Sequence, residues 1–418
     1  MAPIMMRQAT ASTTVQQAFT PVRSVRANAR SVVVVKAQAG PAPTPSASAR
    51  STVVPKAAAA APPVALPTKL PKKEASPYDV LTLSTWLLKE EAKGVLNSEL
   101  AIVISSISLA CKQIASLVNR AGISNLTGLA GAANIQGEDQ KKLDVVSNEV
   151  FKNCLANSGR TGVIASEEED LPVYVEETYS GDYIVVFDPL DGSSNIDAGI
   201  SVGSIFGVYE PNEECPLDAI DDPTKMMEQC VVNVLQPGNA LKCAGYCLYS
   251  CSTILVLTIG HGVYGFTVDP LIGEFVLTHR DIKIPETGMI YSFNEGNMDM
   301  WEPPVQEYMK SLKVPENWGG KPYTARYIGS LVGDFHRTLL YGGIYGYPSD
   351  KKNKFGKLRL LYECAPMSFI AEQAGGVGST GEMRVMDVMP DKVHQRVPLF
   401  VGSRKEVEYL ESFTKKQH

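Results

Sequence analysis

The segment Phe187–Ser194 (FDPLDGSS) carries the strongest signal for both fold and chemistry. It begins at the end of a β-branched run, Tyr183–Phe187 (YIVVF), which predicts a buried strand. Asp188 and Asp191 come where that strand would enter a turn, and the Gly-Ser-Ser end offers backbone N–H groups and hydroxyls for an anion. Carboxylates for a hard cation beside donors for a phosphate predict metal-assisted phosphate chemistry. The alternative is a solvated Asp-Pro-x-Asp-Gly turn, which is common.

A second acidic cluster follows another short apolar run. Gly162–Ser166 (GVIAS) precedes the four acids of Glu167–Asp170 (EEED). Two strands that each end in carboxylates are expected to present them at one sheet edge, where α/β sites usually lie. Asp144 and Glu363 are further candidates, although each alone is typical of a surface charge or of a helix start. An acidic run by itself is more often a solvated face.

Hydrophobic spacing predicts helices and strands in alternation, and hence an α/β layered fold. Strand-like runs begin at Gly162, Tyr183, Ser201, Thr253, Gly262 and Glu274. Helical spacing is found at Leu81–Lys93, Glu99–Ala121, Asp144–Ala156, Trp301–Leu312, Val332–Tyr341 and Pro366–Ala374.

The first 73 residues differ in composition from the rest of the chain. They contain ten Lys or Arg residues and no Asp or Glu, and are rich in Ser, Thr, Ala and Val. This composition predicts an organelle transit peptide followed by an Ala/Pro-rich linker. Because the whole chain has a formal net charge of −6, the remaining residues carry −16. Such an acidic body argues against nucleic-acid binding and against a membrane-surface role.

The eight cysteines form no CxxC pair, which argues against a structural zinc site. Cys215 and Cys230 lie in an acidic stretch within residues 210–238, between two strand-like segments. We interpret 210–238 as a surface insertion. The two thiols either pair with each other or remain unpaired at the surface.

The residues also match a known family through several motifs in the same order. The chain resembles the fructose-1,6-bisphosphatases, which implies an α-β-α-β-α sandwich with two lobes in one subunit. Residues 74–281 would form the lobe with the metal carboxylates, and 282–418 the sugar-bisphosphate-binding lobe. The motifs are KKLDV at Lys141, SEE at Ser166, FDPLDGSSNID at Phe187, YSFNEGN at Tyr291, ARYIGS at Ala325, HRTLLYGGIYGYP at His336 and GKLRLLYECAPM at Gly356.

The resemblance implies a role for each matching position. Two or three Mg²⁺ ions would be held by Glu167, Glu168, Asp188, Asp191, Glu363 and the Leu190 carbonyl. Asp144 and Glu168 would orient and deprotonate the attacking water, and Glu138 aligns with the family's mobile-loop aspartate, a task that Asp139 could take instead. The substrate would be bound by Asp191, Gly192, Ser193, Ser194, Asn294, Arg326, Tyr327, Tyr347, Lys357 and Arg359.

The plastid members of the family carry an acidic, cysteine-bearing insertion whose disulfide is reduced by thioredoxin. Cys215 and Cys230 resemble its first two cysteines, while Leu235 stands where the third is expected. The resemblance therefore implies redox activation in the chloroplast stroma. It also implies a homotetramer, because the family's arginine at Arg326 reaches a neighbouring subunit's site. A sedoheptulose-1,7-bisphosphatase and a non-catalytic regulatory protein on the same scaffold remain the alternatives.

Overall fold

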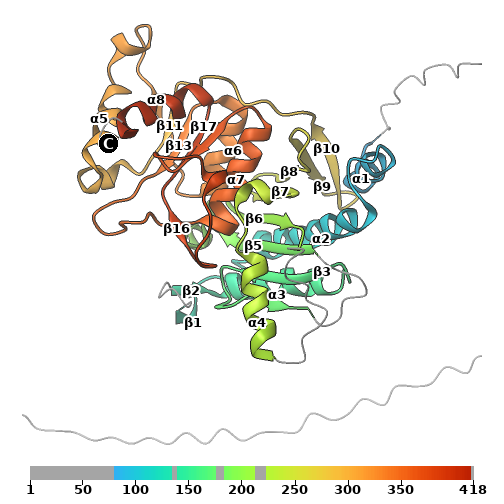
Figure 1. The fold of residues 1–418 in the computed structure, drawn as a ribbon. Coiled ribbons are helices and arrows are strands. Elements are labelled where there is room, and N and C mark those ends of the chain that lie inside the picture. Colours follow the sequence, from blue (N-terminus) through green and yellow to red (C-terminus); the bar gives the residue numbers. More distant parts are fainter. Residues whose placement is uncertain (1–79, 134–138, 176–182, 212–222, 416–418) are drawn as a thin grey trace, which may run out of the picture. The chain divides into compact units, whose positions relative to one another are not determined.

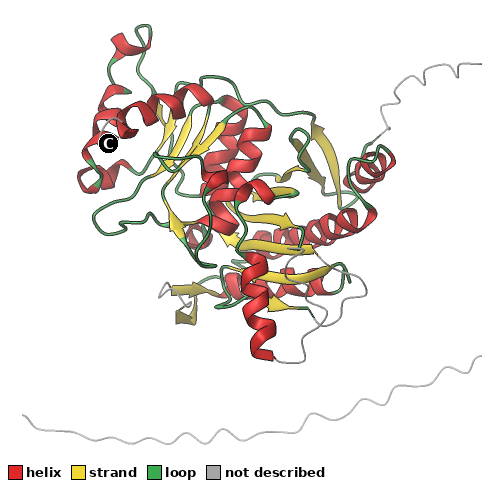
Figure 2. Ribbon diagram, in the orientation of Figure 1, coloured by secondary structure: helices red, strands yellow, loops and turns green. Residues whose placement is uncertain are grey.

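The strand predicted at Tyr183 is the buried centre of the structure, and two sheets alternate with three layers of helices around it (Figures 1 and 2). The computed structural model describes residues 80–133, 139–175, 183–211 and 223–415. These residues belong to one unit, Lys73–His418. The predicted α-β-α-β-α layering is confirmed, and the six predicted helices all occur within two residues of their expected bounds.

The larger sheet has eight strands in the order β10-β9-β8-β7-β6-β5-β3-β4. Its neighbouring strands are antiparallel except for the parallel pair β3 and β5. This pair is the one whose ends carry the two acidic clusters. The strands are β3 (Thr161–Ser166), β4 (Val173–Tyr174), β5 (Tyr183–Asp191), β6 (Val202–Tyr209), β7 (Cys243–Tyr249), β8 (Thr253–Thr258), β9 (Tyr264–Asp269) and β10 (Glu274–His279).

The outer helices α1 (Leu83–Ala92), α2 (Ser98–Arg120) and α3 (Lys142–Ala156) pack with one face of this sheet in a single apolar cluster. Asn97 begins α2, and its Oδ1 accepts a hydrogen bond from the Leu100 N–H at 2.8 Å. Among the described residues, α2 is the helix long and apolar enough to cross a membrane. Its apolar stripe is buried against the sheet, as in the core helix of a layered domain.

The middle layer consists of α6 (Leu331–Tyr341) and α7 (Ala365–Gln373), which contact both sheets. Gly203 in β6 permits the close approach of α6, because a Cβ there would lie 2.6 Å from Val332 Cγ1. A substitution at this glycine would push apart the sheet and the helix whose first turn borders the acidic cluster.

The smaller sheet has five strands in the order β12-β11-β13-β17-β15, with α5 and α8 on its outer side. Two short pairs, β1 with β2 and β14 with β16, lie outside both sheets. The bounds are β11 (Ile290–Ser292), β12 (Thr324–Ala325), β13 (Ile344–Tyr347), β15 (Val377–Ser379), β17 (Leu399–Gly402), α5 (Pro303–Ser311), α8 (Arg404–Thr414), β1 (Leu129–Ala133), β2 (Asp139–Lys141), β14 (Leu358–Arg359) and β16 (Arg396–Val397).

The cysteine-bearing stretch contains a helix, α4 (Pro223–Val234), which contacts β3, β4 and β5. The Cys230 side chain is 1% exposed and belongs to the apolar cluster between the two sheets. The interpretation of Cys230 as a surface thiol is therefore wrong, because α4 turns this residue toward the strands while Glu228 and Val232 are exposed. The insertion at 210–238 stays a prediction. Cys215 lies outside the described residues.

Candidate active site

The parallel pairing of β3 with β5 sets the acidic clusters side by side. Ser166 pairs with Phe187 in register, and the Glu167 N–H donates to the Phe187 carbonyl at 3.2 Å. Glu167 and Asp188 therefore leave the sheet at the same edge, as the sequence predicts. Their backbones are fixed by the strand ladder rather than by a flexible loop.

The two aspartates of β5 are buried and held by backbone groups. Asp188 is 3% exposed, and its Oδ1 accepts from the Leu190 N–H at 2.9 Å. Asp191 Oδ2 accepts from the Val332 N–H at 3.1 Å, in the first turn of α6. Because the register of β5 against β6 shifts between the two aspartates, this strand end departs from simple alternation.

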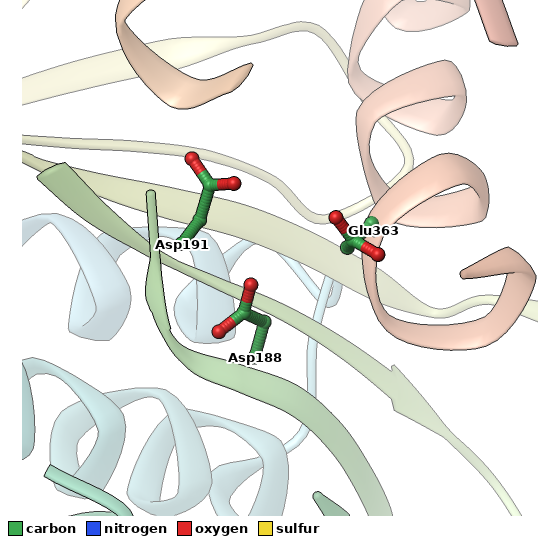
Figure 3. A group of neighbouring side chains, drawn as sticks. All are labelled: Asp188, Asp191 and Glu363. Atoms are coloured by element: carbon green, nitrogen blue, oxygen red, sulfur yellow. The ribbon is translucent and has the colours of Figure 1, made fainter. Parts of the chain in front are cut away.

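A third carboxylate comes from the other end of the chain. Glu363 lies in a short π-helical turn, η5 (Leu360–Cys364), directly before α7. Its Oε2 accepts from the Arg359 N–H at 2.6 Å. Carboxylate oxygens of Asp188, Asp191 and Glu363 all lie within 4.8 Å of one another (Figure 3). Residues 172 positions apart in sequence, Asp191 and Glu363, thus share one cluster.

Burial and mutual repulsion make this cluster electrostatically unfavourable by itself. Burial is the main cause that raises the pKa of Asp188 well above its usual value, with Glu167 adding to the effect. Burial likewise raises the pKa of Asp191 to about 7 and that of Glu363 to about 8. Close, buried carboxylates of this kind require protons or cations for compensation.

The surrounding acids divide between the cluster and other partners. Glu167 forms an ion pair with Arg359 at 2.9 Å, and Glu168 accepts a hydrogen bond from the Gln140 side chain. Burial raises the pKa of Glu168 to about 7 and that of Asp144 to about 6. Glu169 instead pairs with Lys152 at 2.7 Å and accepts from Asn148. Only the first two acids of the EEED run therefore face the cluster.

The cluster lines a cavity of about 460 Å³ in which acidic, small polar and basic residues meet. Gly192 follows Asp191 with a φ of 75°, a left-handed conformation that suits glycine. It leads into the short 3-10 helix η1 (Ser193–Ala198) beside the acids. The cavity is lined by Gln140, Lys141, Asp144, Glu167, Glu168, Asp188, Leu190, Asp191, Gly192, Ser193, Ser194, Tyr327, Gly329, Leu331, Tyr345, Tyr347, Lys357, Leu358, Arg359 and Glu363.

This donor set fits divalent cations. Every candidate ligand is an oxygen, as hard cations prefer, and the described residues that line the cavity include no histidine or cysteine. Asp144 Oδ1 is also buried without a hydrogen-bond partner among the described residues. Such an unpartnered oxygen beside clustered acids is consistent with a missing positive partner.

Comparison with known proteins decides the family. The family model "Fructose-1-6-bisphosphatase, N-terminal domain" matches residues 81–280, and "Fructose-1-6-bisphosphatase, C-terminal domain" matches 284–415. The chain belongs to the fructose-1,6-bisphosphatase family. It is accordingly a phosphatase, a hydrolase of phosphoric monoesters.

Its relatives in this family include plastid proteins and solved structures. The chain is 68% identical to "Fructose-1,6-bisphosphatase, chloroplastic" of Triticum aestivum over 83% of this chain and 85% of the relative. It is 66% identical to "Fructose-1,6-bisphosphatase 1, chloroplastic" of Arabidopsis thaliana, with 84% of each chain covered. The crystal structure of Leishmania major fructose-1,6-bisphosphatase in holo form superposes with a TM-score of 0.75 and 44% identity, covering 80% of this chain and 99% of that one.

Most catalytic, metal-binding and substrate-binding positions implied by the fructose-1,6-bisphosphatase resemblance meet in the cavity, but two of the described ones do not. Asn294 and Arg326 are outside its lining, and Arg326 is exposed. Glu138 and Cys215 lie outside the described residues. The positions that line the cavity are Asp144, Glu167, Glu168, Asp188, Leu190, Asp191, Gly192, Ser193, Ser194, Tyr327, Tyr347, Lys357, Arg359 and Glu363.

The structure also shows site residues that the sequence reasoning missed. Lys141 lines the cavity and pairs with Asp197 at 2.7 Å, and Tyr345 lines it beside the predicted tyrosines. Ser330 and Val332 hold Asp191 from the start of α6. Lys141 and Tyr345 sit inside quoted family motifs, so their positions were available as a signal. The α6 contacts depend on packing, which one sequence does not show.

Proposed function

We propose that this protein hydrolyses the 1-phosphate of fructose 1,6-bisphosphate to give fructose 6-phosphate and phosphate. The observation that carries the proposal is the convergence of Asp188, Asp191 and Glu363 beside a Gly-Ser-Ser segment in a cavity with basic residues. The names of relatives at up to 68% identity support the substrate. A metal cluster for one phosphate, together with basic and hydroxyl groups for another, would suit a substrate that carries two phosphates.

We propose two or three Mg²⁺ ions as cofactors, held by the five carboxylates and the Leu190 carbonyl. Bound there, they would neutralise the phosphate and stabilise the leaving oxygen. Asp144 and Glu168 line the cavity beside the cluster, where they would orient and deprotonate the attacking water. The Gly192–Ser194 segment would donate hydrogen bonds to the phosphate oxygens.

The far end of the cavity would bind the second phosphate. Lys357, Tyr327 and Tyr347 line it and offer a charge and two hydroxyls. Arg326 is exposed, so we propose that it acts in the site of a neighbouring subunit within a homotetramer. Asn294 would complete the binding of the substrate. Binding energy at this end would orient the reacting phosphate.

Asp188→Asn tests the catalytic proposal most directly. We expect phosphate release from fructose 1,6-bisphosphate to fall by at least about 1,000-fold, because one shared metal ligand is lost. Glu169→Gln is the matched control, since Glu169 contacts Lys152 and Asn148 instead. It should retain activity within about threefold. Near-normal turnover in Asp188→Asn would refute the assignment, and preference for sedoheptulose 1,7-bisphosphate would correct the substrate.

We also propose a location in the chloroplast stroma and activation by thioredoxin through Cys215 and Cys230. The chloroplastic relatives support the organelle. Cys230 is buried, and burial raises the pKa of its thiol.

The redox proposal predicts different responses of the wild-type and Cys230→Ser proteins. Oxidised wild type should gain activity on treatment with dithiothreitol or reduced thioredoxin, because reduction removes the cross-link between Cys215 and Cys230. Cys230→Ser should have the same activity before and after reduction. Phosphate release before and after reductant measures both, and equal activation of the two proteins would contradict the pairing.

A further inference from the structure

The segment that joins β12 to α6 carries two side chains expected to bind the distal phosphate, the phosphate of the substrate that is not hydrolysed. Tyr327 lines the cavity, whereas Arg326 is exposed. Several backbone polar groups of this segment are held by hydrogen bonds. The Arg326 N–H donates to the Tyr291 carbonyl at 2.9 Å, and the Gly329 carbonyl accepts from Asn195 Nδ2 at 3.0 Å.

Asp334 supplies the central contacts of this segment. Its side chain is fully buried in the first turn of α6, outside the cavity lining. Asp334 Oδ2 accepts from the Ile328 N–H at 2.9 Å and from the Gly329 N–H at 3.1 Å. A buried carboxylate that bonds two successive amides fixes the backbone direction there.

Arg337 completes the arrangement one turn further along α6. Its Nη2 forms an ion pair with Asp334 Oδ1 and donates to the Arg326 carbonyl at 2.6 Å. The same nitrogen donates to Ser292 Oγ at 2.8 Å, at the end of β11. The pair therefore clamps the peptide groups on both sides of Tyr327.

The same helix holds the metal end of the site. Asp191 accepts from the Val332 N–H, and Ser330 Oγ lies 3.5 Å from the same carboxylate oxygen. A single rigid element thus fixes both an acid of the cluster and the segment that carries Arg326 and Tyr327. The spacing between the two ends of the site is set by this helix.

We propose that Asp334, acting with Arg337, is a positioning residue for the distal phosphate of the substrate. The inference rests on the proposed function and adds that the fit to a bisphosphate of this length depends on α6. Asp334 acts through the backbone of residues 326–329 and touches no substrate atom. Loosening it should impair recognition of the second phosphate more than the chemistry at the first.

The test compares Asp334→Asn with wild type on two substrates, with Mg²⁺ present. For fructose 1,6-bisphosphate we expect KM to rise at least about tenfold and kcat to stay within about threefold. For fructose 1-phosphate, which lacks the distal phosphate, kcat/KM should remain within about twofold. Tyr341→Phe, on the exposed end of α6, is the control and should change neither.

Equal losses on both substrates, or an unchanged KM for the bisphosphate, would overturn the inference. If Asp334→Asn does not fold, Arg337→Lys replaces it, because lysine lacks the planar fork that bonds the Arg326 carbonyl. For that variant too, we expect a raised KM for fructose 1,6-bisphosphate and an almost unchanged kcat/KM for fructose 1-phosphate. If the wild type hydrolysed neither substrate, the proposed function itself would fail. That result differs from one in which the variant affects both substrates equally.

Discussion

At the scale of single residues, Arg359 makes contacts that the resemblance does not imply. The resemblance places it among the substrate-binding residues. Its side chain is 5% exposed and forms an ion pair with Glu167 at 2.9 Å, and its N–H holds Glu363. Arg359 is therefore the cation that balances part of the acidic cluster. Its removal would leave Glu167 uncompensated beside three other buried acids.

The variant Arg359→Met should accordingly be destabilised most when metal is absent. We expect the free energy of unfolding to fall by up to about 3 kcal/mol in EDTA, because a largely buried pair is broken. Added Mg²⁺ should reduce this deficit, since a bound cation restores the missing positive charge. Denaturant unfolding with EDTA and with Mg²⁺ measures both values.

Arg384→Met provides the comparison for this prediction. Arg384 pairs with Glu372 at 2.6 Å on a more exposed part of the surface, away from the cavity. Its removal should cost about 1 kcal/mol or less, with no dependence on Mg²⁺. A Mg²⁺-independent deficit in Arg359→Met would show that the arginine does not balance the metal cluster.

At the scale of elements, α6 also carries a partly buried histidine that should make stability depend on pH. His336 Nδ1 lies 2.8 Å from the hydroxyl of the buried Tyr246. Burial, with a smaller effect of His279, lowers the pKa of His336 from 6.5 to about 4. The unfolded chain therefore binds this proton at higher pH than the folded chain does, and acid favours unfolding.

As the pH is lowered, the free energy of unfolding should begin to fall near pH 6.5, the pKa of His336 in the unfolded state. The fall should be complete near pH 4, its pKa in the folded state. Its full size is about 3 kcal/mol. His336→Asn keeps a side-chain amide near the Nδ1 position and should lack this component. Because many carboxylates titrate in the same range, the measurement is the difference in unfolding free energy between the two proteins from pH 7 to 4. A constant difference would contradict the assignment.

The elements that the sequence predicted are those whose patterns are local. The β-branched run at Tyr183 and the apolar stripe of α2 each require only the residues within the element. The packing of α4 was not predictable in this way. Its acidic surroundings indicated a surface loop, but contacts with β3, β4 and β5 bury Cys230. Tertiary packing decided the exposure of that residue.

At the scale of the whole molecule, local patterns located the carboxylates but not their partners. Asp188 and Glu167 were expected at one sheet edge because each follows a strand-like run, and the parallel pairing of β3 with β5 confirms this. The approach of Glu363, and the support of Asp191 by α6, depend on how the two halves of the chain pack. Motif order supplied Glu363 only through the family resemblance. Arg326 is exposed and outside the cavity lining, so its proposed role rests on the family resemblance.

Hybrid oligomers test whether Arg326 acts across a subunit boundary. Asp188→Asn lacks a metal ligand, and Arg326→Ala lacks the proposed ligand for the neighbour's distal phosphate. In a pair with reciprocal contacts, the Arg326→Ala subunit keeps an intact metal cluster and receives Arg326 from its Asp188→Asn partner. That one site should be fully active, although each variant alone is impaired.

Equal amounts of the two variants are dissociated and reassembled together. Half of the resulting pairs should be mixed, and each mixed pair has one complete site. Phosphate release per subunit should therefore recover to about a quarter of the wild-type value. The double variant reassembled with itself is the control and should stay inactive. If Arg326 served its own subunit, every site in the mixture would carry one defect. Activity no greater than the sum of the separate variants would then place Arg326 in its own site and remove the argument for an obligatory oligomer.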